Sequence, residues 1–560
     1  MATLAPAPRL TARFAAAIGL GAFLLFQVQF ILGKQLLPWF GGAPAVWTTC
    51  MLFFQLALLA GYAYAHALAR APAPAQRRVH LTLLLAAALL LLARAFLWPS
   101  PITPPGAWRP DPGAAPQAAI AALLAATIGL PFLVLAATGP LLQSWFARAC
   151  PGASPYRLYA LSNLGSLLGL GTYPFLIEPA LAVAGQGWLW AAGFALYALL
   201  CAPLAVVAGR APAALLDLPA AAAPAPSPGQ KALWFGLAAV ASTLLLAVTT
   251  QISLEVAVIP FLWMLPLALY LLSFILCFEA PRLYHRGLWL PLLFAGAGGA
   301  AAVVVIGVHV PALLQLAVLL LALLAYCMVC HGELARRQPP PRHLTAYYLL
   351  IAAGGAAGGV FTGLWELPIA LVAGAALAAG ILLRAPYPLL RRKVARALAP
   401  AALAAAVLAL AGVLAYHARD ELAGNLHNDR GFFGTLRVDR DHGEHGEFIR
   451  LRHGRITHGV QFVDDDYRAT PNSYYAGRSG VGLAVTYHPR RFRREPLAIG
   501  VIGLGTGTIA TYALAGERVR FYEIDPKVVA LSGGDAPFFT RLAECAGAVE
   551  IAVVDARLSL

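Results

Sequence analysis

Three glycines near the end of the chain stand where a backbone could closely approach a bound cofactor. Gly503, Gly505 and Gly507 follow the apolar segment PLAIGVIG and begin TGTIATYALA, which is expected to be helical. Glycine suits a turn with positive φ and leaves no side chain between backbone and ligand. Glu523 ends the next apolar segment, where a carboxylate can accept the hydroxyl protons of a ribose. The spacing predicts a nucleoside-binding β–α–β unit.

The glycine spacing indicates which nucleoside is expected. A dinucleotide fingerprint places Gly or Ala at position 508, which here is Thr508. The resulting G-x-G-x-G is more typical of folds that bind S-adenosylmethionine-type cofactors. Asp525 follows Glu523 closely, and Asp555 ends a third apolar segment, VEIAVVD, where it could face an adenine amine. These residues predict a cofactor site, and the alternative is a Rossmann-like fold that has lost its ligand.

The rest of the chain has the composition of a membrane protein. It is 60% hydrophobic and 12% charged, with a mean hydropathy of +0.72, whereas soluble domains are about 25% charged. Thirteen apolar runs are long enough, or nearly so, to cross a bilayer. They are 14–33, 46–66, 79–97, 117–142, 158–177, 187–208, 232–250, 256–278, 288–308, 311–330, 345–365, 367–383 and 400–416.

The charge distribution orients these runs. Residues 417–560 hold 18 basic and 18 acidic residues, so the net charge of +15 belongs to the membrane part. Its basic loops alternate with loops poor in Lys and Arg, which predicts a cytoplasmic N-terminus in a bacterial inner membrane and argues against nucleic acid as a partner. Thirteen crossings would put residue 417 onward outside the cytoplasm, unless 400–416 does not cross.

The membrane part contains a weak internal repeat. LYALSNLGSLLG (158–169) aligns without gaps with YYLLIAAGGAAG (347–358). Either two related halves form a transporter-like bundle, or small residues let helices approach in both places. The halves are expected at 1–210 and 231–416, with a Pro/Ala linker at 211–230.

From residue 417 short strand-like segments separated by Gly, His and Asp appear. We expect a small antiparallel β region at 417–494 and a Rossmann-like α/β domain of the methyltransferase type at 495–560. Three parallel strands leave one edge unpaired and one face uncovered, so this last domain is expected to be incomplete.

These segments resemble a known family. LRHGRITHGVQF, TPNSYYAGRSG, GLGTGT, YEID and VVDA are similar to motifs of the polyamine aminopropyltransferases (spermidine synthases). LLPWFGGAPAVWTT, YRLYALSNLGSLLGLGTYPFLIEP and CHGELARRQPPPRHLTAYYLL resemble bacterial membrane proteins described as fused transporter-like/spermidine synthase-like. The resemblance covers nearly the whole chain.

The resemblance implies a transferase of polyamine biosynthesis. It would move an aminopropyl or related alkyl group from S-adenosylmethionine or its decarboxylated form to a small amine or polyamine. The proton-accepting carboxylate is expected beyond Leu560. Thr506 stands where the family has Asp, which favours the ordinary cofactor, and His453–Gly454 replaces its Asp–Gly pair. The alternatives are a transporter or sensor with a non-catalytic nucleoside-binding domain, and an S-adenosylmethionine-dependent methyltransferase.

Other polar residues have a functional and a structural interpretation. Gln461, Tyr474 and Tyr475 could form the amine pocket or simply pack. CMVCH (327–331) has the spacing of haem attachment, and DHGEHGE (441–447) could form a metal site with His453 and His458. Burial and a hairpin tip explain them better, so neither haem nor metal is expected. The expected partner is the lipid bilayer, and a homo-oligomer is a further alternative.

Polar residues within or beside the apolar runs could mark a transport pathway, since such groups are costly in lipid. Interfacial capping explains the glutamates equally well. These residues are Glu178, Glu255, Glu366, Gln27, Gln29, Gln35 and Asn163.

Overall fold

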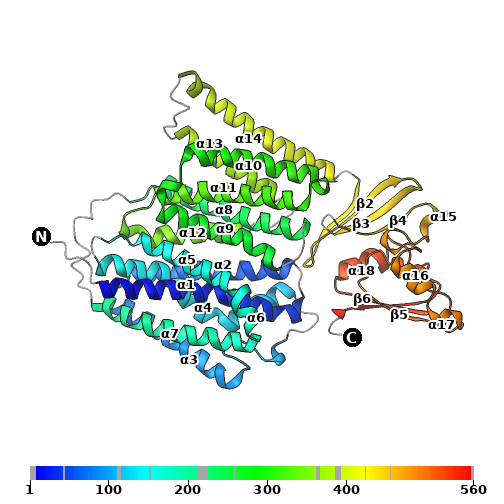
Figure 1. Ribbon diagram of the computed structural model, residues 1–560, viewed down its shortest axis with the longest axis horizontal. Coiled ribbons are helices and arrows are strands. Elements are labelled where there is room, and N and C mark those ends of the chain that lie inside the picture. The colour runs from blue at the N-terminus through cyan, green and yellow to red at the C-terminus, as the bar shows by residue number, and fades with distance from the viewer. Residues whose placement is uncertain are drawn as a thin grey trace. The chain divides into compact units, whose positions relative to one another are not determined.

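The structure is a computed structural model, and its helices and strands can be followed in Figure 1. It describes residues 8–41, 44–109, 115–150, 153–210, 225–255, 260–360, 366–384, 393–422, 424–453 and 456–556. The chain forms two compact units, one made of nearly all of residues 1–414 and the other of residues 415–560. Each unit is described separately.

The first unit is a helical bundle in two halves, whose helices lie side by side in Figure 1. The first half contains α1 (Pro8–Phe40), α2 (Pro44–Ala69), α3 (Ala73–Leu97), α4 (Pro116–Ala149), α5 (Tyr156–Thr172), the π-helical turn η2 (Tyr173–Ile177), α6 (Glu178–Ala180) and α7 (Val183–Arg210). The second half contains α8 (Pro228–Glu255), α9 (Pro260–Glu279), α10 (Arg286–Ile306), α11 (Ala312–Arg336), α12 (Leu344–Val360) and α13 (Glu366–Arg384). A further helix, α14 (Lys393–Leu422), leads into the second unit.

The predicted membrane spans correspond to helices. Each of the thirteen apolar runs falls on one helix, apart from a few run ends. The end of run 158–177 forms the turn η2, the end of run 288–308 lies in the 3₁₀ turn η6 (Gly307–His309), and others lie outside the described residues. Within the described part, eleven helices are long and apolar enough to cross a bilayer. The remaining two are α12, with 17 residues, and α9, whose described apolar part is Met264–Glu279. The chain is therefore a multi-pass integral membrane protein.

The outer surface of the bundle is apolar, as lipid contact requires. Large hydrophobic side chains are widely exposed on peripheral helices, including Phe96 of α3 (83%), Leu199 of α7 (73%) and Leu408 of α14 (70%). In water such surfaces would be costly, whereas hydrocarbon chains solvate them without penalty. Helices are also suited to this environment because their backbone hydrogen bonds are satisfied internally.

Glycines bring α1 and α5 into backbone contact. A Cβ added at Gly165 would lie 2.4 Å from the carbonyl oxygen of Gly19, and one at Gly169 would lie 2.6 Å from that of Phe23. The residue number increases in the same direction along both helices, from Gly165 to Gly169 and from Gly19 to Phe23, so the two helices run parallel. Only glycine permits this approach.

The second half uses the same contact between α8 and α12. A Cβ at Gly354 would lie 2.3 Å from the carbonyl oxygen of Phe235, and one at Gly358 would lie 2.7 Å from that of Ala239. These glycines follow Gly165 and Gly169 by the 189 residues of the predicted repeat. Close approach is thus a real property of both segments, and it builds the same parallel helix pair in each half.

The second unit contains two sheets. An antiparallel sheet in the order β1-β2-β3-β4 is made of β1 (Asn425–Arg430), β2 (Thr435–Gly443), β3 (Gly446–His453) and β4 (Ile456–Phe462). A parallel sheet in the order β5-β6-β7 is made of β5 (Ala498–Ile502), β6 (Arg518–Glu523) and β7 (Ala548–Val553). The short helices are α15 (Asp465–Arg468), α16 (Gly480–Thr486), α17 (Pro489–Phe492) and α18 (Pro526–Gly533).

The two sheets share one hydrophobic core. Val438 and Leu451, paired across β2 and β3, pack in the same cluster as Phe521 of β6. The opposite face of the parallel sheet is open, because Ile502 is 71% exposed and the side chains of Arg520 and Glu550 are 52% and 49% exposed.

A full Rossmann-like methyltransferase domain is not shown. The segment after the glycine turn, expected to be a helix, forms only the 3₁₀ turn η10 (Thr508–Tyr512). β-Branched residues are common in it and Gly516 has a positive φ soon after, both of which oppose a longer helix.

Candidate functional site

A cavity of about 180 Å³ lies inside the membrane unit. It is lined by α1, α2, α4 and α5 of the first half and by α8, α9 and α12 of the second. Most of its wall is aliphatic or aromatic. The polar side chains that line it are Gln29, Gln55, Tyr62, Thr138, Tyr159, Ser162, Asn163, Ser166, Ser242 and Tyr270. The cavity is smaller than the roughly 300–1,000 Å³ of drug-sized pockets, so it suits a small molecule.

Two of the predicted intramembrane polar residues line this cavity. Gln29 donates to its own helix at Leu25 O (3.2 Å), and Asn163 donates to Tyr159 O (2.9 Å). Each amide therefore donates one hydrogen bond to its own helix and also lines the cavity.

The other predicted residues lie elsewhere. Gln27 is buried away from the cavity lining, and both polar atoms of the Gln35 amide are buried without a partner. Glu178 forms an ion pair with Lys34, which joins α6 to α1. The side chains of Glu255 and Glu366 lie outside the described residues.

A pair of repeat-related tyrosines closes one end of the cavity. Tyr159 of α5 stacks on Tyr348 of α12, with ring centroids 4.7 Å apart and an interplanar angle of 22°. These residues are equivalent in the 189-residue repeat, so the symmetry-related positions of the two halves meet here. The Tyr348 hydroxyl donates to Gln143 Oε1 of α4 (2.9 Å), which also joins the halves.

Further contacts between the halves lie at the same end, where α5 and α12 begin. His66 Nδ1 and Thr345 Oγ1 are 2.9 Å apart, and Arg157 Nη2 pairs with Glu279 Oε1 at 3.2 Å. The Tyr156 hydroxyl donates to the carbonyl of Pro339. The two halves are therefore joined at this end by several side-chain contacts. We call the following residues the cross-half contacts: His66, Thr345, Arg157, Glu279, Tyr156, Pro339, Tyr348 and Gln143.

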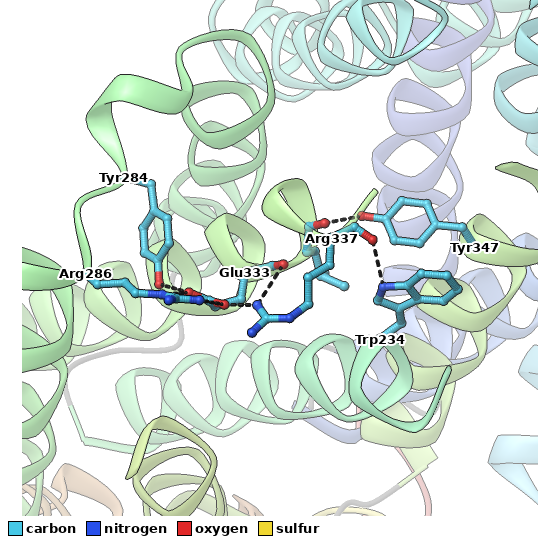
Figure 2. Close-up of polar contacts among 7 residues, drawn as sticks. Trp234, Tyr284, Arg286, Glu333, Arg337 and Tyr347 are labelled. Carbon is cyan, nitrogen blue, oxygen red and sulfur yellow. Dashed lines mark hydrogen bonds and ion pairs between the residues drawn. The ribbon is translucent and has the colours of Figure 1, made fainter. Parts of the chain in front are cut away.

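A buried ion-pair cluster fixes the end of α11 next to this closure (Figure 2). Glu333 is fully buried, and its carboxylate accepts two hydrogen bonds from Arg286, at 2.6 and 2.7 Å. It also accepts the Tyr284 hydroxyl at 2.7 Å and pairs with Arg337. One carboxylate thus neutralises part of the charge of two guanidinium groups.

The same turn of α11 is bonded to two more helices, as Figure 2 shows. Trp234 Nε1 of α8 donates to the Arg337 carbonyl (3.1 Å), and the Tyr347 hydroxyl of α12 donates to the Leu334 carbonyl (2.9 Å). These bonds satisfy carbonyls that a helix C-terminus otherwise leaves free. The end of α11 is held by α8, α12 and the start of α10.

In the first half, a neutral amide, Gln76, accepts the hydrogen bonds at the end of α4, where Glu333 accepts them at the end of α11 in the second half. Trp145 Nε1 and Arg148 Nη2 of α4 both donate to Gln76 Oε1 of α3, at 2.8 and 2.7 Å. Arg148 is equivalent to Arg337 in the repeat, whereas Ser144 stands at the position of Glu333. The two halves therefore differ in charge at otherwise similar ends.

In the second unit the predicted glycine turn follows β5. Gly503, Gly505 and Gly507 all have positive φ (91°, 54° and 70°). Glu523, at the end of β6, accepts the backbone N–H groups of Leu504 (2.8 Å) and Asp525 (2.9 Å) and is 7% exposed. The acidic strand end and the glycine turn are thus adjacent, and the carboxylate holds the turn in position.

The remaining residues of the predicted cofactor site lie on the carboxyl-end side of the sheet. Asp525 caps α18 by accepting from Lys527 N (2.9 Å), and its buried Oδ2 has no hydrogen-bond partner among the described residues. Asp555 follows the end of β7.

Arg541, which the sequence did not single out, lies against the glycine turn. It is 1% exposed and donates to Thr508 Oγ1 (2.7 Å), Thr506 Oγ1 (3.2 Å) and Thr470 O (3.2 Å). Burial lowers the pKa of Arg541 to about 10, so it remains protonated at pH 7. No signal in the sequence relates this arginine to the turn, 33 residues earlier.

The predicted amine-pocket residues do not form one open site. Gln461 is buried and exchanges two hydrogen bonds with Thr540. Gln461 Nε2 donates to Thr540 Oγ1 (2.8 Å), and Thr540 N donates to Gln461 Oε1 (3.0 Å). Tyr474 is 53% exposed, while Tyr475 packs against the core. The two tyrosine rings are tilted by 49° to each other, with centroids 4.4 Å apart.

The structure also places the haem-like motif CMVCH (327–331) and bears on the metal-like motif DHGEHGE (441–447). Cys327, Cys330 and His331 are buried inside α11, where His331 Nδ1 lies 2.8 Å from Ser273 Oγ. In the described residues no three His, Cys, Asp or Glu side chains form a metal-binding group.

Comparison with known proteins gives structural neighbours only. No family model and no curated protein matches the chain. A D-xylose-proton symporter aligns over 67% of this chain and 98% of its own, with 13% identity and a TM-score of 0.43. A bacterial homologue of the iron transporter ferroportin (72% and 99%, 14% identity, TM-score 0.37) and a human organic anion transporter (72% and 99%, 17%, 0.35) also align.

These neighbours correct the family resemblance. They are described as membrane transporters, and none of them is a spermidine synthase-like protein. The identification as a fused transporter-like/spermidine synthase-like enzyme, with its transferase and polyamine biosynthesis assignments, is therefore wrong. The structure gives a physical reason for the glycines of two quoted motifs: Gly165 and Gly169 let α5 contact α1, and Gly503, Gly505 and Gly507 form a turn with positive φ.

Proposed function

We propose that the membrane unit is a transporter that moves a small solute across the bilayer. The observation that carries this proposal is the polar-lined cavity between two halves that are built around the same parallel glycine contact. In bundles of repeated halves, a site at the repeat interface becomes accessible from each side in turn as one half rocks against the other. Each half contains the same parallel glycine contact, and a separate set of contacts joins the halves, so one half can move against the other as a unit.

The closed end faces the cytoplasm of a bacterial inner membrane in this proposal. α1 runs parallel to α5, so the N-terminus belongs to the end where the cross-half contacts lie. Basic side chains gather in the helix ends and connecting loops at this end, as expected for the cytoplasmic side. They are Arg70, Arg77, Arg78, Arg148, Arg157, Arg282, Arg286, Arg336, Arg337 and Arg342.

Cysteine labelling from each side of the membrane tests transport directly. Ser166, on the cavity wall, is replaced by cysteine in a chain whose seven native cysteines are removed. A membrane-impermeant maleimide should reach it in right-side-out and in inverted vesicles, at different rates. Gln230→Cys, at the start of α8, is the control and should react only from the cytoplasmic side. Reaction of Ser166→Cys from one side alone would exclude alternating access.

A second function is proposed for the C-terminal unit, namely non-catalytic binding of an S-adenosylmethionine-type nucleoside. It is supported by three positive-φ glycines beside the buried Glu523 carboxylate at the ends of adjacent parallel strands. A carboxylate has about four acceptor sites, so two backbone donors leave room for ribose hydroxyls. Gly503, Gly505, Gly507, Glu523, Asp525 and Asp555 are the proposed binding residues.

Replacing Glu523 by glutamine is expected to weaken nucleoside binding about tenfold or more. The amide loses the charge that strengthens hydrogen bonds to the ribose, and such bonds are worth about 1.5–3 kcal/mol. Equilibrium dialysis of the full chain with radiolabelled S-adenosylmethionine measures this. Glu550→Gln, on the exposed surface of β7, is the matched control and should bind like the parent. Equal binding by the parent, Glu523→Gln and Glu550→Gln would show that Glu523 does not contact the nucleoside.

A further inference from the structure

The cavity wall is mostly apolar, and the polar groups that it carries are uncharged. Its ten polar lining residues contribute amide, hydroxyl and phenol groups, and among the described residues that line it none is Asp, Glu, Lys, Arg or His. Tyrosine has an ordinary pKa of about 10, so its phenol is neutral at pH 7. A solute in this cavity therefore meets hydrogen-bonding groups and no formal charge.

Aromatic rings lie in the wall beside a larger number of aliphatic side chains. Phe26, Phe54, Phe132 and Phe274 line the cavity together with Tyr62, Tyr159 and Tyr270. Rings from both halves thus surround the space, which favours a flat apolar body that can pack against them. The amides of Gln29, Gln55 and Asn163 lie among these rings and can bond to a polar group carried by that body.

Charge on the solute is disfavoured on energetic grounds. Moving an ion from water into a protein interior costs several kcal/mol unless an opposite charge pairs with it. A desolvated cation–π contact returns about 2 kcal/mol, which does not offset that cost. An anion has no positive partner among the described lining residues.

We infer that the solute bound in the cavity is a small uncharged molecule with an aromatic or similarly flat apolar body and a hydroxyl or amide group. This inference rests on the proposed transport function, whose substrate class it names. It excludes polyamines and other cations, and it excludes organic acids.

Three phenols of similar size whose side chains end in groups of different charge test this inference. Tyrosol is neutral, tyramine is a cation and 4-hydroxyphenylacetate is an anion at pH 7. Binding to the purified full chain in lipid nanodiscs is measured by equilibrium dialysis. Tyrosol should bind at least about tenfold more tightly than either ion. Preference for tyramine or 4-hydroxyphenylacetate, or binding of none of the three, would overturn the inference.

An isosteric charge substitution gives a second, independent measurement. Asn163→Asp places a carboxylate on the cavity wall and should reverse the order, so that tyramine binds more tightly than tyrosol. Gln230→Glu makes the same type of change at the start of α8, outside the cavity lining, and should leave the order unchanged. An unchanged order in Asn163→Asp would show that the probes do not bind in the cavity.

The outcome is separable from that of the transport proposal. Tyrosol binding together with one-sided labelling of Ser166→Cys would retain the solute class and reject transport. Two-sided labelling with a preference for an ion would retain transport and reject the solute class.

Discussion

Glu333→Gln is expected to lower the free energy of unfolding of the membrane unit by about 3–5 kcal/mol. The substitution keeps the size of the side chain but leaves Arg286 and Arg337, which are 18% and 27% exposed, without a neutralising charge. Breaking a buried pair by removing one partner costs this much because the remaining charge stays desolvated. Thermal and denaturant unfolding in detergent measure the loss.

Two further variants separate charge from shape at this cluster. Glu279→Gln removes the exposed pair with Arg157 and should cost less than about 1 kcal/mol, as surface ion pairs do. Adding Arg286→Gln to Glu333→Gln removes one of the uncompensated charges and should recover part of the stability. A Glu333→Gln protein as stable as the Glu279→Gln control would show that the cluster does not hold the end of α11.

Tyr348→Ala is expected to open the closed end of the cavity. The substitution removes the stack on Tyr159 and the bond to Gln143, and truncation of a buried aromatic costs about 3–5 kcal/mol. Because this loss falls on contacts between the halves, it should raise the cytoplasmic labelling rate of a cysteine at Ser166. The readout is the ratio of labelling rates in inverted and right-side-out vesicles.

The conservative variants isolate the role of the hydrogen bond between the halves. Tyr348→Phe keeps the ring and loses only the bond to Gln143, so a smaller rise in cytoplasmic labelling is expected. Tyr326→Phe loses a bond of the same kind to Leu371 O (2.8 Å), but within the second half. It should destabilise the protein without changing the labelling ratio. Equal ratios in all these variants would contradict the assignment of Tyr348 to the closure.

The sequence predicted the helices well because long apolar runs report directly on a lipid environment. Each run corresponds to a helix, and Gly165 and Gly354 correctly indicated close helix approach. Their partners, Gly19 and Phe235, could not be predicted, since nothing local to a glycine states which backbone will fill the space beside it.

The membrane cavity was predicted only in part. Gln29 and Asn163 were recognised as costly polar groups in apolar helices, and both line the cavity. Gln55 was not distinguished, because one amide in a uniformly apolar helix gives no sign of which way it faces. Glu333 was not distinguished within the segment CHGELARRQPPPRHLTAYYLL, because its partners Tyr284 and Arg286 lie 49 and 47 residues earlier.

The distance between the two halves at the closed end tests the central claim most directly. Spin labels are placed at Ser154, before α5, and at Leu283, before α10, and the distance distribution is measured in nanodiscs by pulsed electron paramagnetic resonance. Rocking of the halves predicts two distances, with the longer one more populated in Tyr348→Ala. A single distance that stays the same in the parent and in Tyr348→Ala would contradict a transporter that exposes its cavity to each side in turn.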